Sequence, residues 1–302
     1  MAGLKRTLNF AEVTFFAAGV ILGAGIYTII GQAAGYGGHM LWLSFLIAAL
    51  TALMTAFSYA ELVSLFPKAG GEFVYVKNAM GINIALVVGV LVSFCGIGGG
   101  ATIALGFAGY FSQLLPLNAT ISALAIIGII FLINIAGIKQ SSAFNILFTI
   151  IEIGGLLFVI FAALPAIGTK SYFELPPDGF NGLMVAGALS FFAFTGFEDT
   201  VKLAEETKHP EKNIPRALFT ASGIVIVLYL AVVLAAISAV PFEKLAQAKS
   251  PLSLITETRY GRTGALIIAV IALFSTSNSL LSNMLGASRM VYGWPKKKIS
   301  SH

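Results

Sequence analysis

The stretch Gly19-Val20-Ile21-Leu22-Gly23-Ala24-Gly25-Ile26-Tyr27 places three glycines in the middle of an apolar run that is long enough to cross a membrane. Each glycine inside a helix costs about 1 kcal/mol relative to alanine, so the helix is weakest at this point. The stretch Phe191-Phe192-Ala193-Phe194-Thr195-Gly196-Phe197-Glu198-Asp199 breaks a second apolar run and adds two acids. The two stretches predict two helices that are interrupted inside a membrane.

Composition supports the membrane assignment. The chain has 302 residues, of which 58% are hydrophobic and only 10% are charged, and its mean hydropathy is +0.92. Soluble domains carry about 25% charged residues. The apolar runs are long and unbroken, which indicates helices rather than the short alternating strands of a membrane barrel. The sequence therefore predicts an all-α integral membrane protein.

The length of a membrane span divides the chain into eight runs, because about 20 apolar residues are needed to cross the bilayer. The expected spans are 11–35, 40–65, 82–114, 119–138, 142–165, 181–203, 215–241 and 263–292. We expect residues 1–165 to hold spans one to five as a first repeat. Residues 166–302 would then hold spans six to eight as a partial second repeat.

The positive charges predict the orientation. Most of the 18 lysines and arginines, including Lys296–Lys298, fall in segments on the same side as the amino end. Cytoplasmic loops carry such an excess, so we expect a multi-pass protein of the cell membrane with both termini in the cytoplasm. The cytoplasmic loops then account for most of the net charge of +5. The expected partner is the lipid bilayer rather than a nucleic acid.

The two interruptions together indicate what the membrane protein holds. A half-helix that begins after Gly23 would present free N–H groups at 24–26, and such an end attracts a carboxylate. Free carbonyls at Phe194 and Thr195 would accept hydrogen bonds from an ammonium group. Paired breaks in two halves are typical of a transporter's substrate site, here one for an α-amino acid. The alternative is that Gly19 and Gly23 only allow close helix packing.

Four stretches resemble the amino acid–polyamine–organocation superfamily of amino acid permeases. They are the glycines from Gly23 to Tyr27, the segment Phe66–Gly71, the long segment Phe191–Ala217 and the segment Ser275–Gly293. The third, which runs through Ile214-Pro215-Arg216-Ala217, is the most specific. Together with the other stretches it extends the resemblance over nearly the whole chain.

This resemblance implies an inverted-repeat leucine-transporter-like fold and secondary active transport of amino acids. It implies that the substrate lies between broken helices 1 and 6, at Gly23, Ala24, Gly25, Ile26, Phe192, Phe194, Thr195 and Gly196. Members of the superfamily continue through further spans after the eighth, so we expect an incomplete fold of 5 + 3 transmembrane helices, in which transport itself is open. The alternative is a permease-like sensor or assembly subunit that binds an amino acid without moving it.

Ionisable and polar groups inside the spans are candidates for coupling to an ion gradient. They are Glu152, Glu198, Ser275 and Thr276. Glu152 would bind a proton, or would complete an oxygen cage for Na⁺, near Gly19–Gly23 and Ser275–Ser277. The alternatives are that Glu152 is protonated and silent, that Glu198 only reaches towards cytoplasmic water, and that the hydroxyls only join helices.

The remaining expectations concern the substrate side chain, Arg289 and the histidines. The substrate side chain would meet Cys95, Gly96, Gly98, Gly99, Phe192 and Phe197, which favours neutral or broad specificity. Arg289 would pair with Glu12 or Glu61, or would reach the membrane surface. The histidines at 39, 209 and 302 do not converge and no catalytic arrangement appears, so we expect no enzyme, no resident metal and no cofactor, and the oligomeric state is open.

Overall fold

The computed structural model describes residues 4–112, 114, 115, 117–248 and 250–294, and Lys296–Lys298 and His302 lie outside this part. All regular elements of the described part are helices, and one isolated bridge joins Leu8 and Thr207. Its α-helices are α1 (Phe10–Gly37), α2 (Leu41–Leu65), α3 (Gly71–Met80), α4 (Ile82–Phe111), α5 (Ala119–Ile135), α6 (Ile138–Ala163), α7 (Gly179–Ala193), α8 (Phe197–Val201), α9 (Pro210–Ala239), α10 (Phe242–Gln247) and α11 (Pro251–Tyr292). Single turns of 3₁₀ helix are η1 (Gly38–Met40), η2 (Leu164–Ala166) and η3 (Ala204–Glu206).

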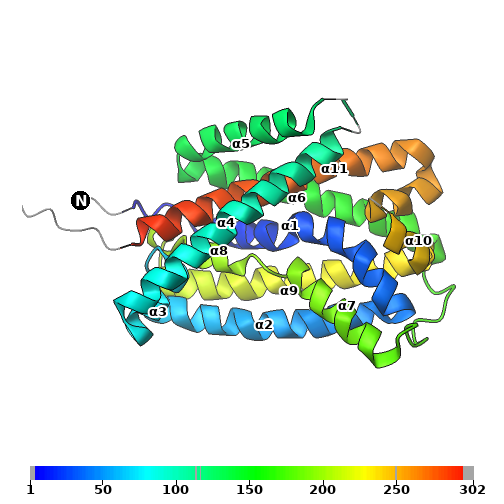
Figure 1. The fold of residues 1–302 in the computed structure, drawn as a ribbon, viewed down its shortest axis with the longest axis horizontal. Coiled ribbons are helices and arrows are strands. Elements are labelled where there is room, and N and C mark those ends of the chain that lie inside the picture. The colour runs from blue at the N-terminus through cyan, green and yellow to red at the C-terminus, as the bar shows by residue number, and fades with distance from the viewer. Residues whose placement is uncertain (1–3, 113, 116, 249, 295–302) are drawn as a thin grey trace, which may run out of the picture.

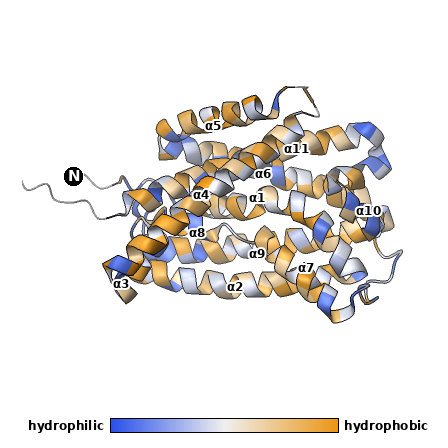
Figure 2. Cartoon of the chain, in the orientation of Figure 1, coloured by the Kyte–Doolittle hydropathy of each residue, from blue (hydrophilic) through white to orange (hydrophobic). Residues whose placement is uncertain are grey.

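The long helices form one bundle with α1 near its centre (Figure 1). Helix α1 packs against α6, α7, α9, α10 and α11, and more than half of its residues are buried. Large apolar side chains on the outer faces of α2, α4 and α5, among them Met54, Phe94 and Leu132, are exposed. Apolar residues cover the flanks of the bundle and hydrophilic residues gather at its two ends (Figure 2). This is the pattern of a protein that is surrounded by lipid.

Six helical stretches are long and apolar enough to cross a membrane, and the first of them, Phe10–Leu65, contains both α1 and α2. Helix α5 is apolar but has only 17 residues. Each expected run thus lies on a described helix or helix pair, and the protein is a multi-pass membrane protein. The eighth run begins earlier than predicted, because α11 starts at Pro251 and continues through a kink at Gly261, where φ is 59°.

Both predicted breaks are present. Helix α1 leaves helical geometry at Gly23, with φ 18° and ψ −164°. Helices α7 and α8 are separated by 194–196, and Gly196 has φ 120°, which favours glycine. A Cβ on Gly196 would lie 2.7 Å from Val20 Cγ1 and 2.9 Å from the Val20 carbonyl oxygen. The broken helices therefore touch through backbone at a point where a side chain does not fit.

A second close approach lies at Gly19, where α1 meets α6 and α11. A Cβ there would collide with the Thr149 hydroxyl and would lie 2.6 Å from Asn278 Nδ2. The Gly19 carbonyl instead accepts a hydrogen bond from Asn278 Nδ2 at 3.4 Å. Gly19 is needed because polar side chains of two other helices occupy the volume beside it.

We predict that Gly19→Ala lowers the melting temperature of the detergent-purified chain, because overpacking a filled site costs about 1–3 kcal/mol. The matched control is Gly223→Ala on α9, where a Cβ would meet nothing within 4 Å. That change should be neutral or slightly stabilising, since alanine is the better helix former. Equal melting temperatures for the Gly19 variant and the wild type would contradict the packing described here.

Candidate functional site

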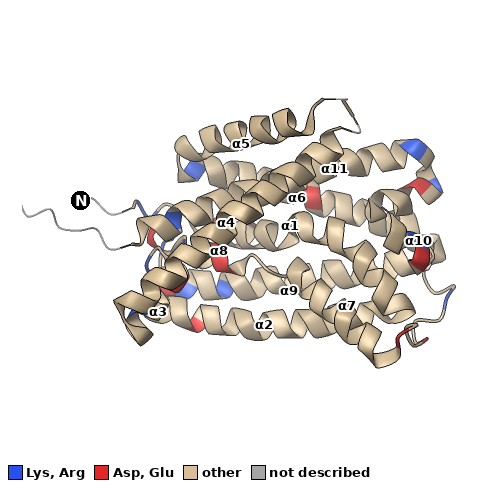
Figure 3. Ribbon diagram, viewed as in Figure 1, with Lys and Arg blue, Asp and Glu red and all other residues tan. Residues whose placement is uncertain are grey.

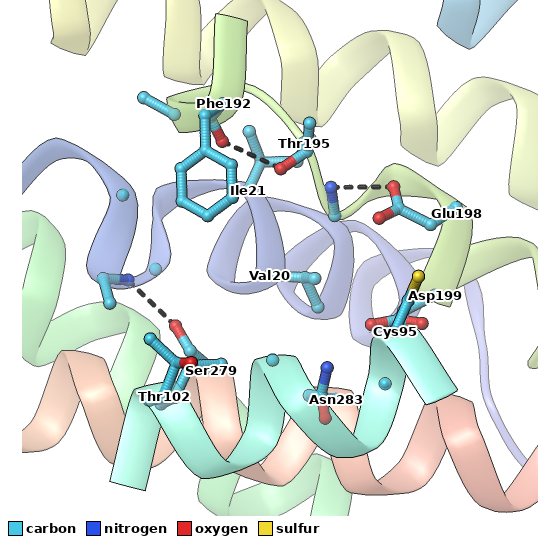
Figure 4. Close-up of a pocket in the computed structure, with 18 of the residues that line it drawn as sticks. Val20, Ile21, Cys95, Thr102, Phe192, Thr195, Glu198, Asp199, Ser279 and Asn283 are labelled. Carbon is cyan, nitrogen blue, oxygen red and sulfur yellow. Dashed lines mark hydrogen bonds between the residues drawn. The ribbon is translucent and has the colours of Figure 1, made fainter. Parts of the chain in front are cut away.

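The two breaks open into one cavity of about 540 Å³ between α1, α4, α7, α8 and α11. The close-up in Figure 4 shows Phe192, Thr195 and Glu198 on one wall and Thr102, Ser279 and Asn283 opposite them. Of the predicted substrate-site residues, the lining includes Gly23, Ala24, Gly25, Phe192, Thr195 and Gly196. Ile26 and Phe194 are not in the lining; both are buried in the core.

The break in α1 is bound by α11. The Ala24 N–H donates a hydrogen bond to Ser279 Oγ at 2.9 Å (Figure 4). A Cβ on Gly23 would lie 2.5 Å from the same oxygen, so the absence of a side chain at Gly23 allows this contact. Gly25 is held equally close to the other broken helix, because its Cβ would lie 2.9 Å from Ala193 Cα. The first free N–H of the half-helix is therefore already paired with a side chain.

The break between α7 and α8 is closed by its own polar groups. The Thr195 hydroxyl donates to the Phe192 carbonyl at 2.8 Å, and the Gly196 N–H donates to Glu198 Oε2 at 2.8 Å. The Phe194 ring turns away from the cavity and packs edge-on against Phe45 and Tyr229. Glu198 thus has a structural contact as well as a place in the cavity wall.

Charged residues gather at one end of the cavity. Lys202 Nζ lies 2.7 Å from Asp199 Oδ1 and 3.9 Å from Glu72 Oε2, and all three side chains are largely buried. Burial alone would lower the pKa of Lys202, but the carboxylates of Asp199 and Glu72 outweigh it and raise that pKa above its ordinary value. Burial raises the pKa of Glu72, against the opposing effect of Lys202. Lys202 therefore keeps its positive charge at neutral pH.

Glu152 lies on α6 and is not in the cavity lining. It is fully buried, and Ser275 Oγ donates to its Oε1 at 2.5 Å. Its other oxygen has no hydrogen-bond partner in the described part of the chain. Thr276 does not join this group, because its hydroxyl donates to the Ala272 carbonyl of its own helix at 2.8 Å.

Asn145 and Thr149 of this buried polar layer were missed from the sequence, whereas Asn278 belongs to the polar cluster that starts at Ser275. Asn145 Nδ2 donates to Asn278 Oδ1 at 2.8 Å, and Asn278 Nδ2 donates to Thr149 Oγ1 at 3.1 Å. Spacing is the signal that would have found them: Asn145, Thr149 and Glu152 recur on one face of α6, and Ser275, Asn278 and Ser282 on one face of α11.

Tyr229 was also missed, since a single tyrosine in an apolar span carries no pattern. Its buried hydroxyl lies 2.6 Å from the Leu22 carbonyl oxygen and 3.0 Å from that of Ile21, within hydrogen-bonding distance of both. These are carbonyls that the break in α1 releases. Helix α9 therefore pairs the carbonyl side of the break, while α11 pairs its N–H side.

The expected partners of Arg289 were wrong. Arg289 forms a two-pronged ion pair with Glu206, at 2.6 Å from Nη2 and 2.7 Å from Nε. Glu12 instead caps α1 with Asn9, and Glu61 is exposed. The Glu206 carbonyl also accepts from the Thr7 and Leu8 N–H groups, so one residue joins the start of α1 to the end of α11.

The expected side-chain pocket is correct in part. Cys95, Gly96, Gly99 and Phe192 line the cavity, but Gly98 and Phe197 do not. A Cβ on Gly98 would meet nothing within 4 Å, so this glycine faces outwards. Phe197 is buried against the ring of Tyr59, with 5.4 Å between centroids. The direction in which each residue faces on its helix decides whether it lines the cavity, and residue type alone does not reveal that direction.

Sequence comparison finds matches over nearly the whole length of the chain. The family model described as "Amino acid permease" matches residues 8–300. Branched-chain amino acid permease BcaP of Bacillus subtilis (strain 168) is 30% identical over 315 residues, covering 96% of this chain and 67% of that protein. Cationic amino acid transporter 1 of Arabidopsis thaliana is 28% identical over 304 residues, covering 95% and 51%. The chain thus spans about half to two thirds of these relatives.

Two solved structures share the fold. A Na⁺-coupled sialic acid symporter in a substrate-bound outward-open state superposes with a TM-score of 0.64 at 13% identity, covering 94% of this chain and 65% of that one. A manganese transporter of Eremococcus coleocola gives a TM-score of 0.63 at 12% identity, covering 93% and 65%. At this identity the likeness shows the fold alone, and it confirms the predicted leucine-transporter-like architecture.

We predict that Glu206→Gln lowers the melting temperature of the chain. Removing one partner of a buried ion pair costs about 3–5 kcal/mol, and somewhat less here because the Arg289 side chain is 19% exposed. Glu211→Gln is the control, since its pair with His209 spans 3.9 Å and is exposed. Equal melting temperatures for the Glu206 and Glu211 variants would show that the ion pair does not hold these segments together.

Proposed function

Because this chain belongs to the amino acid permease family, a family of secondary amino acid transporters, we propose that it carries amino acids across the cell membrane. The observation that carries the proposal is that both broken helices, α1 and α7–α8, open into one cavity of about 540 Å³. The relatives are named as permeases and transporters, which favours transport over the alternative of a sensor or assembly subunit.

The substrate would lie with its carboxylate at the start of the second half of α1 and its amine at the break before α8. Gly25 supplies an N–H at the positive end of a half-helix, where an anion is stabilised. Phe194 and Thr195 lie between the end of α7 and the start of α8, so their carbonyls belong to neither helix and could face an ammonium group. An α-amino acid carries both charges on one carbon, which matches two breaks on one cavity.

The charges in the cavity wall favour some side chains over others. Glu198, Asp199 and Lys202 all line the cavity, and Lys202 is paired with Asp199 at 2.7 Å. Glu198 has no cationic partner within 4 Å in the described part of the chain. The excess of acid leads us to propose that neutral or positively charged amino acids bind and that acidic ones are repelled.

The orientation in the membrane is also a proposal. Charged residues gather at the two ends of the bundle (Figure 3), and α1 begins and α11 ends at the same end (Figure 1). The positive-inside rule assigns this end, which also carries α3 and the segment from Lys202 to Arg216, to the cytoplasm. Lys202 and its carboxylate partners would then form the cytoplasmic floor of the cavity.

Reconstitution tests the proposed function. Proteoliposomes that hold the chain should accumulate labelled neutral or cationic amino acids, and excess leucine or lysine should compete more strongly than excess aspartate. Gly25→Val should abolish uptake because the new side chain meets Ala193, whereas Gly98→Val, whose side chain would face open space, should not. Absence of both uptake and binding in the wild type, or full activity of the Gly25 variant, would overturn the proposed site.

We propose further that a proton, rather than Na⁺, drives uptake and that Glu152 binds it. A Na⁺ ion at this break would need several free oxygens, as hard cations do. The nearby carbonyls are partly engaged: the single O–H of Tyr229 lies at hydrogen-bonding distance from the Ile21 and Leu22 carbonyls, and the Gly19 carbonyl accepts from Asn278. A proton needs only one oxygen, and Glu152 Oε2 is unpaired in the described part.

Glu152→Gln tests this assignment, because an amide keeps the shape of the side chain but binds no proton. Uptake driven by an inward proton gradient should fall at least tenfold, while exchange of internal for external amino acid should continue. Glu174→Gln, whose side chain is 63% exposed, is the control and should leave both activities unchanged. Uptake by the wild type that follows a Na⁺ gradient without a proton gradient would contradict the proposal.

A further inference from the structure

We propose that Ser279 is a specificity-determining residue that donates a hydrogen bond from its hydroxyl to the substrate carboxylate. This inference rests on the proposed function and deepens it, because it moves part of carboxylate recognition from the backbone of α1 to a side chain of α11. The contact that carries it is the 2.9 Å hydrogen bond from the Ala24 N–H to Ser279 Oγ.

The direction of that hydrogen bond determines whether the Ser279 hydroxyl still has a free donor. A serine hydroxyl has one O–H donor besides its acceptor sites. Ser279 accepts from Ala24 and donates to no acceptor in the described part of the chain. Its neighbours on α11 differ, because Thr276, Ser277 and Ser288 donate to carbonyls of their own helix. The Ser279 O–H is therefore available.

The position of Ser279 gives that free donor a target. Ser279 lines the same cavity as Gly23, Ala24 and Gly25, and Figure 4 shows its oxygen directed at the break in α1. Acceptance of the Ala24 N–H polarises the hydroxyl, which makes it a stronger donor. The hydroxyl thus extends the positive end of the half-helix into the cavity, next to the N–H of Gly25.

Glycine at 23 is a condition of this arrangement. A Cβ on Gly23 would lie 2.5 Å from Ser279 Oγ and 3.7 Å from Ser279 Cβ, so any side chain there would displace the serine. The approach of α11 to the break is therefore as close as the backbone allows. Glycine at position 23 therefore does more than break the helix, because it makes room for the Ser279 hydroxyl as a ligand of the carboxylate.

The test compares Ser279→Ala with Ser277→Ala in proteoliposomes that hold the full chain. The readout is the concentration of leucine, and separately of leucinamide, that halves uptake of a labelled amino acid. Leucinamide keeps the amine and the side chain but has no carboxylate. Ser279→Ala should weaken leucine about tenfold and leucinamide less than twofold, because a hydrogen bond to a charged group is lost only with leucine. Ser277→Ala should match the wild type.

Two outcomes would overturn the inference. Leucine inhibition that is unchanged in Ser279→Ala overturns it, and so does an equal loss for leucine and leucinamide, which would mean that the cavity has been distorted. If leucinamide does not inhibit uptake by the wild type, the change in leucine inhibition alone tests the inference. The melting temperature of the Ser279 variant must then equal that of the wild type. A wild type that takes up no amino acid would instead overturn the proposed function.

Discussion

The structure depends on one constraint, which is that a bilayer offers no water to a backbone group released from a helix. Two spans are broken in this protein, and each break needs hydrogen-bond partners for the backbone groups that it releases. Ser279 of α11 accepts the Ala24 N–H, and the Tyr229 hydroxyl of α9 lies at hydrogen-bonding distance from the Ile21 and Leu22 carbonyls. The Gly196 N–H is paired by Glu198. Side chains therefore make the interruptions possible: those of neighbouring helices at the break in α1, and those of adjacent residues at the break between α7 and α8.

The same partners divide the space around α1 into two regions with different chemistry. One side is the cavity, where backbone at both breaks, Ser279 and three charged side chains face a common volume. The other side is a closed polar layer in which Asn145, Thr149 and Glu152 of α6 meet Ser275 and Asn278 of α11. Because the Gly19 carbonyl belongs to that layer, a movement of α1 towards the cavity would disturb both regions. This arrangement provides a physical link between the substrate region and the buried acid.

At the proposed cytoplasmic end, charge and backbone contacts close the bundle. Lys202 joins α8 to α3 through Asp199 and Glu72, and Arg289 joins α11 to η3 through Glu206. Gly70 and Gly293 also approach so closely that a Cβ on Gly293 would lie 2.5 Å from Gly70 Cα. In the proposed transport cycle this end would open to release the substrate, and these contacts would then break and re-form.

The sequence by itself determined the class of the protein, the positions of its helices and the two breaks. These features follow from local properties: apolar length, glycine and the cost of charge in lipid, all of which can be read along one segment. The tertiary structure decided which groups pair across segments. Arg289 pairs with Glu206 and not with Glu12 or Glu61. The Thr276 hydroxyl donates to a carbonyl of its own helix, and Phe194 and Phe197 do not line the cavity. Partner choice depends on helical phase and on the packing of helices far apart in the chain, and neither is written in a single stretch of residues.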